Sequence, residues 1–233
     1  MRISLGCLTK VVSETSCYMC SETATTTEHA PPKCFFPEAK DVGVDLRVNL
    51  ITVPSCDAHN TSRSQDDEYA MMFVVTNYET NRVAREQFGS KCIRALKRSP
   101  GFASAVFNRR RPVRMAGQST VAVEVDRARF DRVIAHTCRA LFFHETGRQL
   151  LDELFVWSPA FRHGGLESDA DEAVLAFSAR QLLQARPRLG RNQEVFWYQI
   201  VEDPGRLVAL RLQFYEGCSV YAACAHGPPE QAA

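Results

Sequence analysis

The sequence predicts an α+β protein with a small zinc-bound module at the N-terminus, a helix, and a C-terminal α+β domain with antiparallel strands. Two observations predict this class. The pairs Cys17-x-x-Cys20 and Cys56-x-x-His59 frame the first part of the chain, and three strand patterns follow one another between residues 194 and 225. A chain of 233 residues has room for this division. We place its boundaries at residues 1–80, 81–115 and 116–233.

The zinc-bound module is predicted to be a hairpin followed by a short helix. Threonines favour a strand over residues 23–29, and the prolines between 31 and 37 exclude a helix from the loop that follows. A second strand over residues 49–53 ends at Pro54. Ser55 is a suitable N-cap for a short helix that carries the second cysteine–histidine pair.

The rest of the chain shows helical and strand patterns in turn. Apolar spacing predicts a helix from Ser64 to Arg98, with acidic residues in its first turn and a break near Asn77, and then a basic loop. Alternation predicts a strand over residues 119–125, and amphipathic spacing predicts a helix over residues 130–151. The last three strands are predicted over residues 194–201, 207–215 and 219–225, with a turn at Asp203-Pro204-Gly205.

The composition favours a cytoplasmic protein that does not enter a membrane. No apolar run approaches the roughly 18 residues that a membrane span needs, and residues 1–7 lack the apolar core of a secretory signal. The nine cysteines are an odd number, which argues against the disulfide framework of a secreted protein. We therefore expect reduced thiols that are able to bind metal.

The two cysteine–histidine pairs predict a structural zinc site. Zinc takes four nitrogen or sulfur ligands in a tetrahedron, and a two-residue spacer lets one turn offer two of them, here from Cys17, Cys20, Cys56 and His59. A redox role for the first pair has less support, because no βαβ pattern surrounds it. A catalytic zinc also has less support, since four protein ligands leave no open position for water.

A basic segment follows the first module. Between Arg82 and Arg114 the chain has ten Lys or Arg and a single acid, Glu86, in a protein whose formal net charge is only +1. Such a segment favours a polyanionic partner, most simply the phosphates of nucleic acid. A solvated helix face followed by a loop is the alternative for any single residue. The candidate phosphate contacts are Arg82, Arg85, Lys91, Arg94, Lys97, Arg98, Arg109, Arg110, Arg111 and Arg114.

Further polar residues stand between and after the metal-ligand pairs in a recognisable order. Glu28-His29 follows the first pair, Asn49-Leu50 precedes the second, and Asn60 follows His59 directly. This order resembles the HNH endonucleases, which have a ββα-metal fold, and in particular a zinc-containing bacterial branch of that family. The resemblance covers residues 15–70 and extends to Ser64-x-Asp66-Asp67-Glu68-Tyr69. Two departures are Glu28, where many members have Asp, and His59, where members often have Cys.

The resemblance implies roles for the matching residues. His29 would be the general base that activates water, and Asn49 would accept a hydrogen bond from the far ring nitrogen of His29. Glu28 and Asn60 would hold one catalytic divalent cation, Mg²⁺ or Mn²⁺. Lys33 joins the candidate phosphate contacts. The implied reaction is hydrolysis of a phosphodiester, most simply in DNA, leaving 5′-phosphate and 3′-hydroxyl ends.

Three features of this hypothesis remain open in the sequence. Glu28 and His29 are adjacent in a strand, so their side chains point to opposite faces unless the backbone bends there. The same residues also suit a zinc-stabilised nucleic-acid-binding module that does not cleave. A third interpretation makes the chain an effector that cuts when a protein partner docks on residues 116–233, or that acts as a homodimer.

Overall fold

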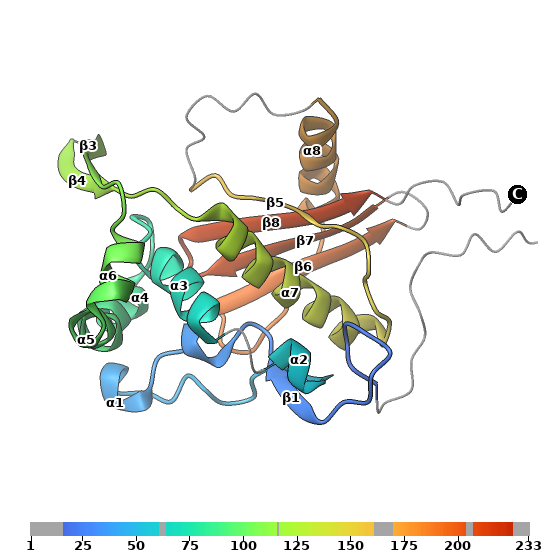
Figure 1. The fold of residues 1–233 in the computed structure, drawn as a ribbon. Coiled ribbons are helices and arrows are strands. Elements are labelled where there is room, and N and C mark those ends of the chain that lie inside the picture. The colour runs from blue at the N-terminus through green and yellow to red at the C-terminus, as the bar shows by residue number, and fades with distance from the viewer. Residues whose placement is uncertain (1–15, 61–63, 116, 161–169, 204–206, 226–233) are drawn as a thin grey trace, which may run out of the picture.

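The computed structural model describes residues 16–60, 64–115, 117–160, 170–203 and 207–225. It is a mixed α+β fold in which all strand pairs of the three sheets are antiparallel (Figure 1). The predicted class is therefore confirmed at the level of α+β architecture with antiparallel strands. Part of the turn predicted at Asp203-Pro204-Gly205 lies outside the described residues.

The N-terminal part contains a two-stranded sheet and short helical segments. Strands β1 and β2 pair so that Glu28 lies opposite Val53 and His29 opposite Thr52. Ser55 is not the predicted N-cap: it is the buried end of β2, still paired with Thr26, and the helix begins two residues later. The elements are β1 (Thr26–His29), η1 (Lys33–Phe35), α1 (Ala39–Val42), β2 (Thr52–Ser55) and α2 (Asp57–Asn60).

The predicted helix from Ser64 to Arg98 is broken near Asn77, as expected. It ends first at Val75, and the Asn81 side chain then caps a new helix by accepting a hydrogen bond from the Ala84 backbone N–H (3.3 Å). A π-helical turn interrupts the second part. The elements are α3 (Ser64–Val75), α4 (Arg82–Gln87), η3 (Phe88–Cys92), α5 (Ile93–Arg98) and α6 (Pro100–Val106).

The basic loop predicted to end at residue 115 is a strand in its last part. Strand β3 (Arg111–Met115) pairs with β4 (Gln118–Ala122). The turn between them contains Gly117 at φ 80°, a conformation that glycine adopts without steric cost. The boundary predicted at residues 115 and 116 therefore falls inside a hairpin.

Helix α7 (Arg127–Thr146) begins and ends earlier than the predicted range of 130–151. The Asp126 side chain accepts a hydrogen bond from the Arg129 N–H (3.2 Å), and Gly147 ends the helix in the left-handed conformation at φ 66°. Both signals are local. The remaining elements are β5 (Phe155–Trp157), α8 (Ala170–Gln184), β6 (Phe196–Asp203), β7 (Leu207–Phe214) and β8 (Cys218–Ala225).

The C-terminal sheet has the order β5-β8-β7-β6 and separates two helices. Along β7, Val208, Leu210 and Leu212 belong to the main core, whereas Leu207 and Ala209 face a smaller apolar cluster with α8. This alternation is the two-residue period of a strand buried on both faces. Helix α7 covers one face of the sheet and α8 the other, and Figure 1 shows the sheet between them.

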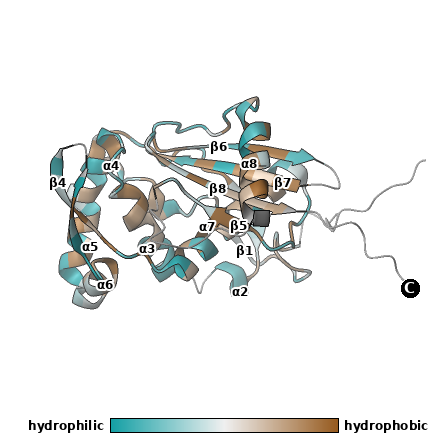
Figure 2. Cartoon of the chain, turned by 90° about the horizontal axis from the view of Figure 1, so that it is seen from above, coloured by the Kyte–Doolittle hydropathy of each residue, from teal (hydrophilic) through white to brown (hydrophobic). Residues whose placement is uncertain are grey.

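One hydrophobic core runs through all three predicted segments. The Phe35 and Phe214 rings lie 5.2 Å apart, and the buried Tyr215 hydroxyl donates to the Gln87 side chain (2.8 Å). In Figure 2 part of α3 has the hydrophobic colour, while α2 is hydrophilic. Within the described residues, no helix combines the length and the apolar character that crossing a membrane requires.

Candidate metal centre and active site

Four predicted ligand atoms come together in the fold. The sulfur atoms of Cys17, Cys20 and Cys56 and the Nδ1 atom of His59 all lie within 4.8 Å of one another. The Cys20 and Cys56 sulfurs are 3.8 Å apart, and His59 Nδ1 lies 3.5 Å from the sulfurs of both Cys17 and Cys20, and 3.2 Å from that of Cys56. The group can hold a metal ion such as zinc.

These separations suit a tetrahedral zinc ion. Zn–S bonds of about 2.3 Å and Zn–N bonds of about 2.0 Å put two sulfurs about 3.8 Å apart, and a sulfur and a nitrogen about 3.5 Å apart. The donor set is three sulfurs and one imidazole nitrogen, which favours zinc over the hard cations that prefer oxygen. The one sulfur–sulfur distance and the three sulfur–nitrogen distances match the expected geometry to within a few tenths of an ångström.

The hairpin explains why residues almost forty positions apart meet. The first pair lies in the turn before β1, and the second lies at the end of β2 and in α2. The Tyr18 N–H donates to the Pro54 carbonyl (2.9 Å), so the turn is fixed to β2. The His59 N–H donates to the Cys56 carbonyl (3.1 Å), which directs both side chains to the same side.

The crowded thiols favour a bound cation. Burial, followed by the neighbouring thiols of Cys17 and Cys56, raises the pKa of Cys20 to about 11. Burial also opposes ionisation of Cys17, but hydrogen bonds from the backbone of Met19 and Cys56 outweigh it, so the pKa of Cys17 is lowered. The surroundings thus favour the thiolate of Cys17 and oppose that of Cys20. A divalent cation removes this conflict, because it binds the three cysteines as thiolates together with the neutral imidazole of His59.

Two residues that sequence reasoning missed connect the metal centre to its surroundings. Gln149, which is buried, donates hydrogen bonds to the carbonyls of Cys17 (2.7 Å) and Cys20 (2.6 Å). Tyr18, inside the first pair, donates its hydroxyl hydrogen bond to Glu28 (2.8 Å). Nothing in the sequence marks Gln149, because it contacts the turn across more than 100 residues of chain. The sequence does place Tyr18 between two metal ligands, but it does not indicate that the Tyr18 side chain points toward Glu28.

The predicted cation ligands share one face of β1. The Asn60 amide donates from Nδ2 to the Thr26 hydroxyl (2.9 Å) and to the Thr27 carbonyl (3.4 Å). Thr26 and Glu28 are two residues apart in the strand and therefore point to the same face. Asn60 thus lies against the face that carries Glu28. This contact joins the end of α2 to the strand that precedes it by thirty residues.

The backbone at Glu28 and His29 is a regular strand. Their partners are consecutive, Val53 and Thr52, so β1 has no bulge there. Glu28 is 9% exposed and its carboxylate accepts the hydrogen bond from Tyr18, whereas His29 is half-buried. The bend that would turn both side chains to one face is not present. The carboxylate and the imidazole therefore lie on opposite sides of the strand.

His29 has a positively charged environment. Partial burial, followed by the charges of Lys33 and Arg47, lowers the pKa of His29 below the ordinary value of 6.5. The imidazole is therefore neutral at pH 7 and able to accept a proton. Arg47 was not among the predicted residues; its Nε donates to the Phe36 carbonyl (3.0 Å), which fixes it near the loop after β1.

Asn49 does not hold His29 in the described structure. It lies in an exposed turn before β2, in the left-handed backbone conformation at φ 54° that asparagine tolerates well. Among the described contacts, no hydrogen bond joins the Asn49 side chain to His29.

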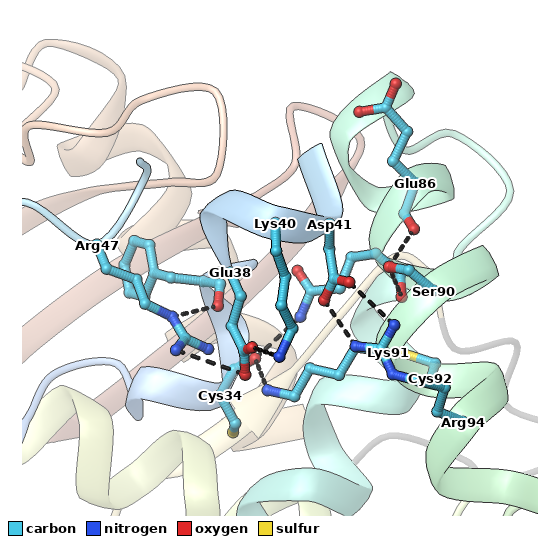
Figure 3. Close-up of polar contacts among 12 residues, drawn as sticks. Cys34, Glu38, Lys40, Asp41, Arg47, Glu86, Ser90, Lys91, Cys92 and Arg94 are labelled. Carbon is cyan, nitrogen blue, oxygen red and sulfur yellow. Dashed lines mark hydrogen bonds and ion pairs between the residues drawn. The ribbon is translucent and has the colours of Figure 1, made fainter. Parts of the chain in front are cut away.

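The basic residues fall into two groups. In the first group each basic side chain binds another part of the protein. Arg94 makes two hydrogen bonds to Asp41 (both 2.9 Å), and Lys91 donates to the Cys34 carbonyl (3.1 Å), as Figure 3 shows. Arg82 pairs with Glu86, Arg85 donates to the Thr80 carbonyl, and Arg109 pairs with Glu124. Within the described part of the chain, no side-chain partner is found for Lys97, Arg98, Arg110, Arg111 and Arg114.

Comparison with protein-family models, with curated proteins and with solved structures finds no match for this chain.

Proposed function

We propose that this protein is a metal-dependent endonuclease of HNH type that hydrolyses phosphodiester bonds in DNA. In this proposal Cys17, Cys20, Cys56 and His59 hold a structural zinc ion, and β1, β2 and α2 form a ββα-metal module. The observation that supports it best is the hydrogen bonding of Asn60 to β1. It brings a third polar group to the strand that carries Glu28 and His29.

His29 acts as the general base. Its neutral imidazole takes a proton from the attacking water, and Lys33 and Arg47 attract the phosphate that is attacked. Displacement at phosphorus is in line, so the attacking oxygen and the leaving oxygen lie on opposite sides of the phosphorus atom. His29 and the cation site at Glu28 lie on opposite sides of β1. This arrangement suits in-line displacement when the phosphate lies at the end of the strand.

Glu28 and Asn60 provide oxygen ligands for one divalent cation. Such a cation, when bound, neutralises charge on the phosphoryl oxygens and on the leaving oxygen. The Tyr18 hydroxyl keeps the Glu28 carboxylate in place, and Tyr18 is itself held between two zinc ligands. The Nδ2 atom of Asn60 donates to β1, which leaves its carbonyl oxygen as the acceptor end. The zinc centre thus supports the catalytic residues through Tyr18 on one side and α2 on the other.

The test is cleavage by the full-length protein. We expect nicking or linearisation of plasmid DNA in Mg²⁺ or Mn²⁺, no cleavage in EDTA, and products with 5′-phosphate and 3′-hydroxyl ends. An RNA of matched length is assayed in parallel to define the substrate class. Absence of cleavage of both nucleic acids in both metals, by a preparation that contains one zinc per chain, would contradict the proposal.

The second candidate is a zinc-stabilised module that binds nucleic acid without cleaving it. The hydrogen bond from Tyr18 favours this candidate, because it already occupies the Glu28 carboxylate that the nuclease proposal assigns to a cation. Salt-sensitive binding of DNA by a zinc-loaded protein that leaves the strands intact in every metal would select it.

A further inference from the structure

The hairpin of β3 and β4 stands apart from the rest of the fold. Its two strands pair over five residues each, and their extensive contacts are with each other. Figures 1 and 2 both show the hairpin at one end of the molecule, beyond the helices α4 to α6. A two-stranded ribbon alone is only marginally stable in water. Most of the described residues of the two strands are exposed, so the surface of the hairpin is available to a partner.

The exposed surface of this hairpin is strongly basic. Arg110, Arg111 and Arg114 are exposed, and none of them has a side-chain partner among the described contacts. Residues 110–122 contain no acid. The pairing between Arg109 and Glu124 (3.0 Å) lies at the base of the hairpin and closes it. The hairpin thus differs from the helices α4 and α5, in which several basic side chains bind neighbouring residues.

The arginines lie on both faces of the ribbon. Arg111 and Arg114 are three residues apart in β3, so they point to opposite faces. Arg110 directly precedes the strand. Val121, which is 56% exposed, adds an apolar side chain on the face of Arg114. A ligand that neutralises these charges must therefore offer negative charge on two sides of the ribbon.

We propose that β3 and β4 form an arm that enters the major groove of double-stranded DNA. A major groove about 12 Å wide and about 8.5 Å deep admits a two-stranded ribbon between two rows of phosphates. Each strand of five residues is about 17 Å long, which is enough to cross that depth. The deep and narrow major groove of duplex RNA does not admit such a ribbon. That the bound duplex is also the substrate rests on the proposed function. Binding of the duplex by the arm does not depend on cleavage.

The experiment measures binding with a protein that does not cut. The full-length His29→Ala variant is titrated with labelled duplex DNA, duplex RNA and single-stranded DNA of one sequence, and anisotropy is followed at several salt concentrations. Adding Arg111→Ala and Arg114→Ala is expected to weaken duplex DNA binding about tenfold or more and to lower the salt slope by about 1.8. The matched control removes two exposed charges outside the predicted phosphate contacts, with Arg186→Ala and Arg191→Ala, and is expected to change binding little.

The groove is identified by chemical protection. Binding is expected to protect guanine N7, which lies in the major groove, and this protection should be lost with the two arginines of the arm. Four results would each overturn the proposal that the arm enters the major groove. They are an equal loss of affinity in the control variant, equal binding of duplex RNA, preferential binding of single strands, and protection confined to adenine N3 in the minor groove. If the unchanged protein never cleaves DNA but binds it as expected, the proposed arm is supported and the proposed nuclease activity is contradicted. If the protein cleaves DNA but the arm variants bind it normally, the nuclease activity is supported and the arm is contradicted.

Discussion

Replacing His29 by alanine is expected to slow phosphodiester cleavage by about 10²–10⁴-fold, the usual contribution of a general base. The imidazole is half-buried at the end of β1, and Lys33 and Arg47 help to keep it neutral. In the proposed mechanism, His29 is the one group that activates water. The measurement is the single-turnover rate of plasmid nicking at saturating Mg²⁺ or Mn²⁺.

The matched control for this variant is Thr52→Ala, which changes the exposed residue directly opposite His29 in the hairpin. It should keep most of the activity. Both variants should retain one zinc per chain and a melting temperature close to that of the unchanged protein, because neither side chain contributes to the core. Added imidazole should restore part of the lost rate in His29→Ala. A full cleavage rate in that variant would remove His29 from the mechanism.

The second large effect is expected from Cys56→Ser. Its sulfur lies 3.8 Å from that of Cys20 and 3.2 Å from His59 Nδ1, so three ligands cannot close the tetrahedron without it. Structural zinc contributes about 10–16 kcal/mol to the folding of small zinc peptides, and the loss of even a few kcal/mol lowers the melting temperature of a protein of this size by about 10 °C or more. We expect zinc content to fall from one to near zero, with a lower melting temperature.

The control for this prediction is Cys34→Ser. Cys34 is also a free, partly buried thiol of the N-terminal part, but it lies outside the group of four ligands. It should retain its zinc. Metal content is measured by mass spectrometry after gel filtration, and unfolding by calorimetry. Equal zinc content in both variants would mean that the four residues do not form the metal site.

The metal ligands were predictable because their signal is local. Each pair has two-residue spacing, and one hairpin is sufficient to bring both pairs together. The contact of Asn60 with β1 follows from the same hairpin, since Asn60 is the residue after a ligand. The alternation of buried residues in β7 likewise agrees with the strand pattern of the sequence.

Other parts of the site depend on contacts that the sequence does not display. Gln149 and Arg47 are fixed by backbone carbonyls of distant or looped segments, and no spacing rule marks such partners. The count of acids between residues 82 and 114 was also misleading. Asp41 and Glu124 lie outside that range in the sequence, yet they neutralise Arg94 and Arg109 in space. Charge counted along the chain therefore overestimates the charge that is available to a ligand.

In the mechanism that we propose, closing one zinc centre assembles the catalytic residues on β1 and α2. The most direct test is the DNA cleavage rate as a function of bound zinc, at fixed Mg²⁺, after the protein has been stripped of metal and reconstituted in steps. We predict a rate that rises in proportion to zinc and reaches a plateau at one equivalent per chain. Full cleavage by the zinc-free protein, or none by the fully loaded one, would rule out this role of the zinc centre.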